Sequence, residues 1–298
     1  MLYNNDNGRH RKYGVKPFSE LSFTDDFMFR KVMYSNPDLC KRVIELLLDI
    51  KVDRINYKGQ DYPITTTTDS KSVRLDVYVD DDDGTVVDLE MQNLSVKALP
   101  RRSRFYQAMV DVDNLLAGSE YYELPNSYIV FICTNFDPYE RGFYKYEFRE
   151  LCLQDTNIEL GSGSSKVFIN AKSKVDEMSE EMRAFLNYLC GKRATTDLTR
   201  DIDAGVANVK AYRPWEAEYM HWNEIVSLAE QDARRVGREE GFKEGREEGR
   251  VKTKFSDVDR LVDLNLLTVE KACEALEVDI ESYKYWKENL GADTGQKS

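Results

Sequence analysis

Two acidic residues, Asp76 and Glu90, have types and spacing that could bind a metal ion. They lie in the segment RLDVYVDDDDGTVVDLEMQ (residues 74–92), where apolar and polar residues alternate on both sides of an Asp-Asp-Gly turn. Such alternation is typical of half-buried strands, and the turn is typical of a β-hairpin. If the turn takes residues 81–85, Asp76 lies directly opposite Glu90 on one face of the hairpin. The other face then pairs only apolar residues: Leu75 with Met91, Val77 with Leu89 and Val79 with Val87.

This placement brings two like charges together. Directly opposed residues of an antiparallel pair have Cβ atoms about 4.5–5.5 Å apart, where two carboxylates repel each other. The repulsion is relieved if one acid is protonated or if a cation binds between them. A hard divalent ion, Mg²⁺ by default with Mn²⁺ as the alternative, accepts two carboxylates and water as ligands. Such an ion acidifies bound water and polarises a phosphoryl oxygen, and Gln92 projects from the same face to orient an attacking water.

A purely structural explanation accounts for the same residues. Acidic residues often alternate on solvent-facing strands, and residues 80–83 have the composition of a solvated turn. Asp88, opposite Tyr78, lies on the same face as Glu90 and is a competing candidate for its role. The spacing by itself therefore leaves a metal site and an ordinary solvated hairpin as alternatives.

Composition limits the chemistry that the chain can perform. The 298 residues include 42 basic and 54 acidic side chains, and the net charge of −12 argues against a general polyanion-coating protein while allowing a local basic groove. Only two histidines are present, His10 and His221, so a catalytic triad or a histidine-ligated transition metal would have to depend on one of them. Carboxylates and an oxygen-ligated metal are the better supported chemistry.

Cysteine content and hydropathy indicate a reducing, non-membrane environment. The five cysteines are odd in number, widely spaced and without a Cys-x-x-Cys motif, which is typical of a cytoplasmic protein with free thiols. The longest apolar runs, residues 43–48 and 128–133, are too short to span a bilayer. Residues 1–14 are polar and show no secretory signal.

Two helices are expected before the hairpin. After a polar, flexible leader (residues 1–16), the segment LSFTDDFMFRKVM predicts a helix capped by Ser22 or Thr24, with two aspartates in its first turn. The segment NPDLCKRVIELLLDI predicts a second helix with Pro37 in its first turn. The β-branched residues 64–68 are a candidate strand.

A helix and a buried strand are expected after the hairpin. The helix begins at Pro100 and has an apolar stripe formed by Phe105, Val112 and Leu116. Residues 127–135 form a continuous apolar run bounded by turn residues, which suits a fully buried strand. Together with the hairpin, these elements predict a compact mixed α/β unit.

The C-terminal part of the chain predicts helices. Residues 161–165 are expected as a loop, residues 180–191 as a helix, and residues 215–254 as one long charged helix. This helix has a glycine every four residues: Gly237, Gly241, Gly245 and Gly249. Each glycine costs about 1 kcal/mol relative to alanine, so the stretch is either a close helix–helix contact surface or a frayed, solvated helix. Residues 257–289 predict two short helices without a basic recognition face, which favours protein–protein contact and indicates a homodimer through the C-terminal helices.

Several motifs together resemble a known nuclease family. They are an Asp in RLDV, a turn, a Glu-x-Gln motif that closes the next strand, and a helix with Arg-Ser-x-x-Tyr, which together resemble the PD-(D/E)xK nuclease superfamily. The resemblance is closest to the recombination-promoting nuclease (Rpn) branch, also described as PD-(D/E)xK family transposases. The segment TDDFMFRKVM of this chain resembles the opening motif of that branch. The resemblance covers about residues 17–150, and the glycine-rich helix and terminal helix pair are similar to the same branch.

This resemblance implies the fold class and a division of the chain. The expected fold is α/β, a restriction-endonuclease-like (αβββαβ) core with a C-terminal helical extension. The expected segments are a leader (1–16), a PD-(D/E)xK nuclease-like domain (17–190), a linker (191–214), the long charged helix (215–254) and a helical-pair tail (255–298).

Carried over to this sequence, the resemblance implies that Asp76 and Glu90 bind the metal and act in catalysis together with Gln92. Gln92 takes the place of the superfamily's lysine, and an amide can only hydrogen-bond where a lysine offsets developing charge, so slower or more conditional cleavage is expected. Asp26 is a candidate further ligand, although capping a helix explains it equally well. The resemblance also places four nucleic-acid-binding residues near the scissile strand, with a solvated helix start as the alternative: Arg101, Arg102, Arg104 and Tyr106.

The implied activity is that of a Mg²⁺-dependent DNA endonuclease. It would hydrolyse the phosphodiester backbone of DNA in recombination, mobile-element movement or defence. The alternative is a catalytically inactive nuclease fold that acts as a DNA-docking or protein-assembly module, which the missing lysine and the acidic balance allow. RNA is a further alternative substrate.

Overall fold

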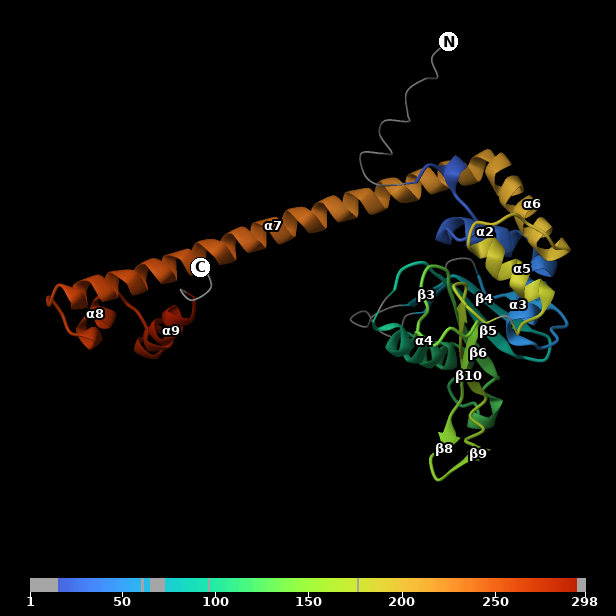
Figure 1. Ribbon diagram of the computed structural model, residues 1–298, viewed down its shortest axis with the longest axis horizontal. Coiled ribbons are helices and arrows are strands. Elements are labelled where there is room, and N and C mark those ends of the chain that lie inside the picture. The colour runs from blue at the N-terminus through green and yellow to red at the C-terminus, as the bar shows by residue number, and fades with distance from the viewer. Residues whose placement is uncertain (1–15, 60–61, 65–72, 96, 176, 294–298) are drawn as a thin grey trace, which may run out of the picture. The chain divides into compact units, whose positions relative to one another are not determined.

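The computed structural model describes residues 16–59, 62–64, 73–95, 97–175 and 177–293. The chain divides into two compact units, Met1–His221 and Trp222–Ser298. A sheet with helices around it forms the first unit, and helices form the second (Figure 1). The expected leader lies outside the described residues, apart from Lys16.

The first unit is built around a mixed sheet. Its six strands lie in the order β1-β4-β5-β6-β10-β7. Their bounds are β1 (Ile55–Tyr57), β4 (Val77–Asp81), β5 (Val86–Gln92), β6 (Ser127–Cys133), β10 (Ser164–Asn170) and β7 (Lys145–Phe148). β5, β6 and β10 are parallel to one another, whereas β4, β1 and β7 pair antiparallel with their neighbours. Every residue of β5 is buried, as expected for a central strand covered on both faces.

Helices cover both faces of this sheet (Figure 1). One face packs against α2 (Asp26–Ser35), α3 (Pro37–Leu48), α5 (Glu180–Leu189) and α6 (Asp197–Ala211), and the other packs against α4 (Leu99–Asn114). This arrangement confirms the expected restriction-endonuclease-like α/β core with a C-terminal helical extension. The buried strand expected at residues 127–135 is β6.

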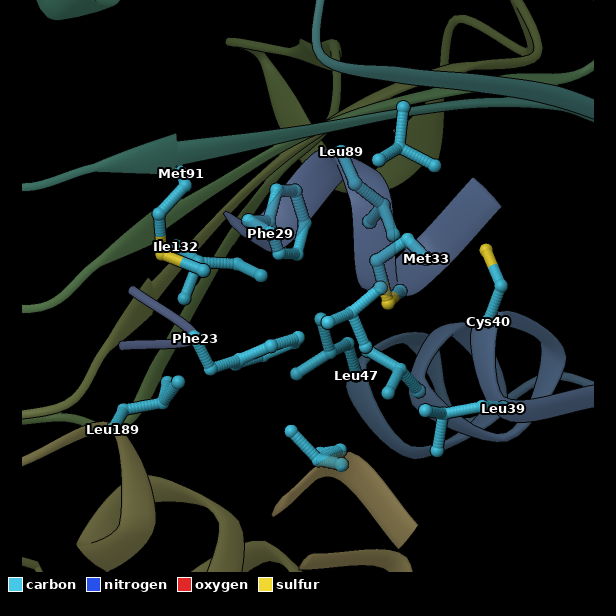
Figure 2. Close-up of a cluster of buried hydrophobic side chains, with 14 of the residues drawn as sticks. Phe23, Phe29, Met33, Leu39, Cys40, Leu47, Leu89, Met91, Ile132 and Leu189 are labelled. Carbon is cyan, nitrogen blue, oxygen red and sulfur yellow. The ribbon is translucent and has the colours of Figure 1, made fainter. Parts of the chain in front are cut away.

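Alternation along β5 assigns its side chains to the two faces of the sheet. Leu89 and Met91 project into the apolar cluster that α2 and α3 line (Figure 2). The intervening residues Asp88, Glu90 and Gln92 therefore face α4. The apolar pattern of one strand thus determines which helix covers its acids.

The hairpin register agrees with the expectation at two pairs and differs at the third. The two pairs present are Val77 with Leu89 and Val79 with Val87. Leu75 instead belongs to β3 (Val73–Leu75), which pairs with β2 (Tyr62–Ile64) in a separate sheet and packs in the cluster on the α4 side. The expected pairing of Leu75 with Met91 is therefore wrong. The chain bends at Asp76, whose carboxylate accepts a hydrogen bond from the Met91 amide in place of the next ladder bond.

Helix α4 buries a different stripe from the expected one. Phe105, Val112 and Leu116 are exposed rather than in the core, with exposed fractions of 37%, 59% and 76%. The buried residues of α4 are Leu99, Ser103, Tyr106, Gln107, Met109 and Val110. This stripe is preferred because it supplies apolar contacts and polar partners for the sheet: the Gln107 amide donates a 2.6 Å hydrogen bond to the Ser127 hydroxyl.

Two expectations near the N-terminus change. The N-cap position of α2 is Asp25 rather than Ser22 or Thr24, and the Asp25 carboxylate accepts a hydrogen bond from the Ser22 amide in the preceding turn. Of the candidate strand at residues 64–68, Ile64 ends β2 and the rest lies outside the described residues.

Further along the chain the structure contains elements that were not expected. The interval 191–214, expected as a linker, contains the whole of a packed helix, α6, whose start is fixed by a capping box between Thr196 and Thr199. A hairpin of β8 (Leu151–Cys152) and β9 (Asp155–Glu159) follows β7.

The C-terminal helices have the expected order. They are α7 (Arg213–Asp263), α8 (Val269–Ala275) and α9 (Ile280–Asp293). α7 begins in the first unit, where the ring of Tyr219 packs on that of Phe27 with centroids 5.1 Å apart, and continues in the second unit. The second unit has its own small core of Phe255, Val258, Ala272, Cys273 and Tyr283. No helix in the described part of the chain is long and apolar enough to cross a bilayer.

Candidate active site

Asp76 and Glu90 contact each other where β4 begins and β5 ends. The backbone amide of Asp76 donates a 3.0 Å hydrogen bond to Glu90 Oε1, and the amide of Met91 donates a 3.2 Å bond to Asp76 Oδ2. The Asp76 side chain is 13% exposed and that of Glu90 is 2% exposed. The structure therefore brings the two acids together, through these two hydrogen bonds rather than through the direct ladder pairing of Asp76 with Glu90 that the sequence predicts.

The electrostatics of the pair are unfavourable without a cation. Burial, followed by the charges of Glu90 and Asp26, raises the pKa of Asp76 well above its usual value, and Arg30 offsets part of this rise. Burial is also the largest cause of the raised pKa of Glu90. The charged form of each carboxyl group is therefore less favourable here than in water, and additional positive charge would offset this cost.

Arg102, from α4, supplies positive charge on one side of the site. Its Nη2 lies 2.6 Å from Glu90 Oε2, and its Nη1 donates a 3.0 Å hydrogen bond to Gln92 Oε1. The same guanidinium donates two hydrogen bonds to the Tyr106 hydroxyl, at 2.9 and 2.6 Å, and lies over the rings of Tyr106 and Phe131. One planar group with several donors thus connects the acid, the amide and two aromatic rings.

Gln92 is held at both ends of its amide. Its oxygen accepts the hydrogen bond from Arg102, and its nitrogen donates a 2.5 Å hydrogen bond to the Leu94 carbonyl. Gln92 therefore has a defined orientation beside Glu90, and its role toward an attacking water stays a prediction.

Arg30 and Asp26, from α2, contribute on the other side. Arg30 pairs with Asp26 at 3.2 Å, and its Nε lies 4.0 Å from Asp76 Oδ1. The sequence interpretation named Asp26 and missed Arg30. The signal was present, because Arg30 and Lys31 are basic residues on a helix whose neighbours Phe29 and Val32 are fully buried.

Asp88, which the sequence predicts as an alternative to Glu90, is a further acid beside the pair. It is fully buried, and neither carboxylate oxygen has a hydrogen-bond partner among the described residues. Burial, and then the charge of Asp76, raises its pKa well above the usual value, while Arg102 lowers it. The three acids Asp76, Asp88 and Glu90 therefore interact electrostatically on the α4 face.

The other expected nucleic-acid-binding residues lie on α4 in different settings. Arg101 and Arg104 are exposed, whereas Tyr106 is buried with its hydroxyl on Arg102. Of the three arginines, Arg102 is the one that forms an ion pair with Glu90. The arginine cluster is thus divided between an inner residue at the acids and two outer residues facing solvent.

The available side chains suit a metal site completed by water better than one enclosed by protein ligands alone. Within the described residues, no group of three or more histidine, cysteine or acidic side chains has the geometry to enclose a metal ion. Asp76 and Glu90 supply two adjacent carboxylates whose pKa values burial raises, and binding of a cation would relieve this unfavourable charge. Two carboxylates completed by water suit an oxygen-preferring ion such as Mg²⁺.

Comparison with known proteins identifies a family from the sequence itself. The model of the family described as PD-(D/E)XK nuclease family transposase matches residues 23–202. This span includes α2 to α5, the central sheet and the first part of α6. No curated protein and no solved structure matches the chain.

Proposed function

This chain belongs to the PD-(D/E)XK nuclease family transposases, and from that membership we propose that it is a divalent-metal-dependent endonuclease that hydrolyses the DNA backbone. The observation that carries the proposal is the contact between Asp76 and Glu90. A buried acid and a largely buried one, joined by a 3.0 Å hydrogen bond from the Asp76 amide to the Glu90 carboxylate, are costly for folding alone.

Each residue of the site has a role in this reaction. Asp76 and Glu90 would hold Mg²⁺ or Mn²⁺, which supplies acidified water and polarises the phosphate when bound. Gln92 would orient the attacking water through its amide, and Asp26 is a further candidate ligand on the side of Arg30. Since an amide has no charge, position 92 offers geometry without the electrostatic help of a lysine.

The DNA would be held by local rather than overall charge. The chain has a net charge of −12, so approach to a polyanion depends on the basic start of α4. Arg101 and Arg104 are exposed there and would contact backbone phosphates, with Arg102 and Tyr106 nearer the acids. Such contacts fix the position of the backbone without reading its sequence.

The setting of this activity is also a proposal. We propose a role in DNA recombination, mobile-element movement or defence, of which the description of the family as transposases supports mobile-element movement. All five cysteines are free thiols, which fits a reducing compartment such as the cytoplasm. The C-terminal helices would join two copies of the chain in a homodimer.

A plasmid-nicking assay tests the activity. The full chain should convert supercoiled plasmid to open circles with Mg²⁺ or Mn²⁺ and not with EDTA. Glu90→Gln and Asp76→Asn should each reduce nicking by at least about a hundredfold, because the loss of a metal ligand should cost at least as much as the loss of a group that only hydrogen-bonds to a ligand. Arg200→Met, an exposed change far along the chain on α6, is the control. Equal nicking by wild type and both acid variants would refute the assignment of the site.

A second candidate function is a nuclease fold without catalysis. It is favoured by one observation: the cation already in contact with Glu90 is Arg102, which can serve as a permanent structural partner. A protein of this kind would bind DNA or partner proteins without a metal. Calorimetric titration of the full chain with Mn²⁺ separates the two candidates, since only the enzyme requires a site that Asp76→Asn removes.

A further inference from the structure

Arg102 lies beside two residues at which positive charge is required, Glu90 and Gln92. It pairs with Glu90, a buried acid that needs a cation, and it donates to the amide of Gln92, which stands where the superfamily has a lysine. The guanidinium of Arg102, from α4, therefore places a positive charge next to position 92, where the side chain itself has none. This location gives Arg102 a part in the reaction beyond general binding of the DNA backbone.

Arg102 is also the more exposed partner of its ion pair with Glu90. The Glu90 side chain is 2% exposed, whereas that of Arg102 is 36% exposed and contacts Glu90 Oε2 directly. A divalent ion that binds Glu90 through Oε2 would share this oxygen with the Nη2 donor of Arg102. A divalent cation and a guanidinium on the same carboxylate oxygen repel each other, so the ion and Arg102 compete for Glu90.

Arg102 would stay bound at the site if its contact with Glu90 were broken. Its hydrogen bonds to Gln92 and Tyr106 involve neutral groups that an ion does not displace, and the Tyr106 ring lies 4.8 Å from its guanidinium carbon. The Nη2 N–H that no longer points at Glu90 becomes available to an anion. A guanidinium binds phosphate oxygens well because its paired donors match their spacing.

We propose that Arg102 exchanges Glu90 for a DNA phosphate when a divalent ion binds. In the metal-free protein it neutralises Glu90. In the loaded protein it stays anchored on Gln92 and Tyr106 and supplies the positive charge that position 92 lacks. This inference rests on the proposed function, because it requires the ion at Asp76 and Glu90.

Metal affinity tests the first half of the exchange. The full chain is titrated calorimetrically with Mn²⁺ at pH 8.5, where protons compete least for the acids. Arg102→Met should bind Mn²⁺ at least about tenfold more tightly than wild type, because no cation has to be displaced. Arg104→Met is the matched control: it removes the same charge from the same helix and should change the affinity by less than about twofold. Tyr106→Phe keeps the charge but removes one anchor and should give an intermediate gain, and it serves if Arg102→Met does not fold.

DNA affinity tests the second half. Binding of a labelled duplex is measured by fluorescence anisotropy with Ca²⁺, which generally supports binding without cleavage, and again with EDTA. With the ion present, wild type should bind the duplex about tenfold more tightly than Arg102→Met, because the variant lacks one hydrogen bond from a charged group. With EDTA, the two proteins should bind the duplex equally. A deficit of the same size in both conditions would show that Arg102 is an ordinary phosphate contact and would overturn the exchange.

The two proposals fail in different ways. If wild type binds no divalent ion at Asp76 and Glu90, the proposed function is wrong and the exchange with it. If wild type binds the ion and Arg102→Met binds it equally or more weakly, the exchange alone is wrong and Arg102 is a supporting residue of the loaded site.

Discussion

At the scale of single residues, two arginines from different helices share the charge of the acidic pair. Arg30 lies beside Asp76 and Asp26, and Arg102 pairs with Glu90. Even so, burial raises the pKa values of both acids, and the rise is increased by the charge of Glu90 at Asp76 and by the charge of Asp88 at Glu90. The metal-free site is therefore a cost to folding, which is typical of groups arranged for function rather than stability.

Asp76→Asn should separate this cost from function. An amide keeps an oxygen that accepts from the Met91 backbone, and it removes repulsion with Glu90. We expect the free energy of unfolding without metal to stay equal or rise by about 1 kcal/mol at pH 8, while stabilisation by Mn²⁺ disappears. Urea denaturation with Mn²⁺ or EDTA measures both. A loss of more than about 2 kcal/mol in EDTA would mean that Asp76 is a structural carboxylate.

Asp88→Asn should change how stability depends on pH. Burial raises the pKa of Asp88, so the folded state retains a proton that the unfolded state releases, and stability falls as the pH rises from about 4 through the raised pKa. The loss is about 1.4 kcal/mol per pH unit for each such acid. Asp88→Asn should therefore match wild type at pH 4 and exceed its stability at pH 8 in EDTA. Parallel stability curves for the two proteins from pH 4 to pH 8 would disagree with this account.

At the scale of elements, α6 holds α2 in place through a close contact. A Cβ atom at Gly205 of α6 would lie 2.9 Å from Val32 Cγ1 of α2. Such a distance forces a β-branched side chain to move, and Val32 is fully buried. Because α2 carries Asp26 and Arg30, this contact supports one side of the candidate site.

Gly205→Ala should therefore destabilise the protein although alanine favours helices. Overpacking costs about 1–3 kcal/mol and the gain in helix propensity is about 1 kcal/mol, so a net loss of up to about 2 kcal/mol is expected. Ala207→Gly, at an exposed position of α6, measures the propensity effect on the same helix. Urea denaturation followed by circular dichroism measures the free energy of unfolding of both variants. If Gly205→Ala raises it by as much as Ala207→Gly lowers it, the close contact has no energetic effect.

The sequence predicted elements well where one periodicity dominates. Strict alternation gave the pairing of Val77 with Leu89, and a long apolar run gave β6. It failed where two patterns compete, as on α4, where the exposed stripe with Phe105 is as apolar as the buried one with Tyr106. The bend at Asp76 could not be predicted, since it depends on a carboxylate replacing a ladder bond. The two acids were therefore predicted from spacing and Arg102 from the family resemblance, whereas the contacts of Arg102 with Glu90 and of Arg30 with Asp76 required coordinates.

At the scale of the whole molecule, the C-terminal unit is small and rich in exposed charge. Its core is a cluster of five buried residues around Phe255. Along α7, a Cβ at Gly237, Gly241, Gly245 or Gly249 would meet nothing within 4 Å in the described chain. This glycine face is open to a second helix, which is the contact alternative of the sequence interpretation.

The proposed homodimer makes the mass of the molecule a test. Light scattering should give twice the monomer mass of 34.6 kDa at micromolar concentration. Gly241→Ala with Gly245→Ala should weaken the dimer, because added methyl groups hold two helices apart. If the variant is still a dimer and has a higher helix content, the dimer contact does not involve these glycines. The alanines then act only by raising helix propensity, by about 1 kcal/mol per position. A monomer at all concentrations would exclude the homodimer.

The location of a bound ion tests the central claim most directly. Crystals of the full chain grown with Mn²⁺ should give an anomalous scattering peak within about 2.0–2.4 Å of carboxylate oxygens of both Asp76 and Glu90, with Arg102 withdrawn from Glu90. A map without a peak there, with Arg102 still donating to Glu90 at saturating Mn²⁺, would contradict the account.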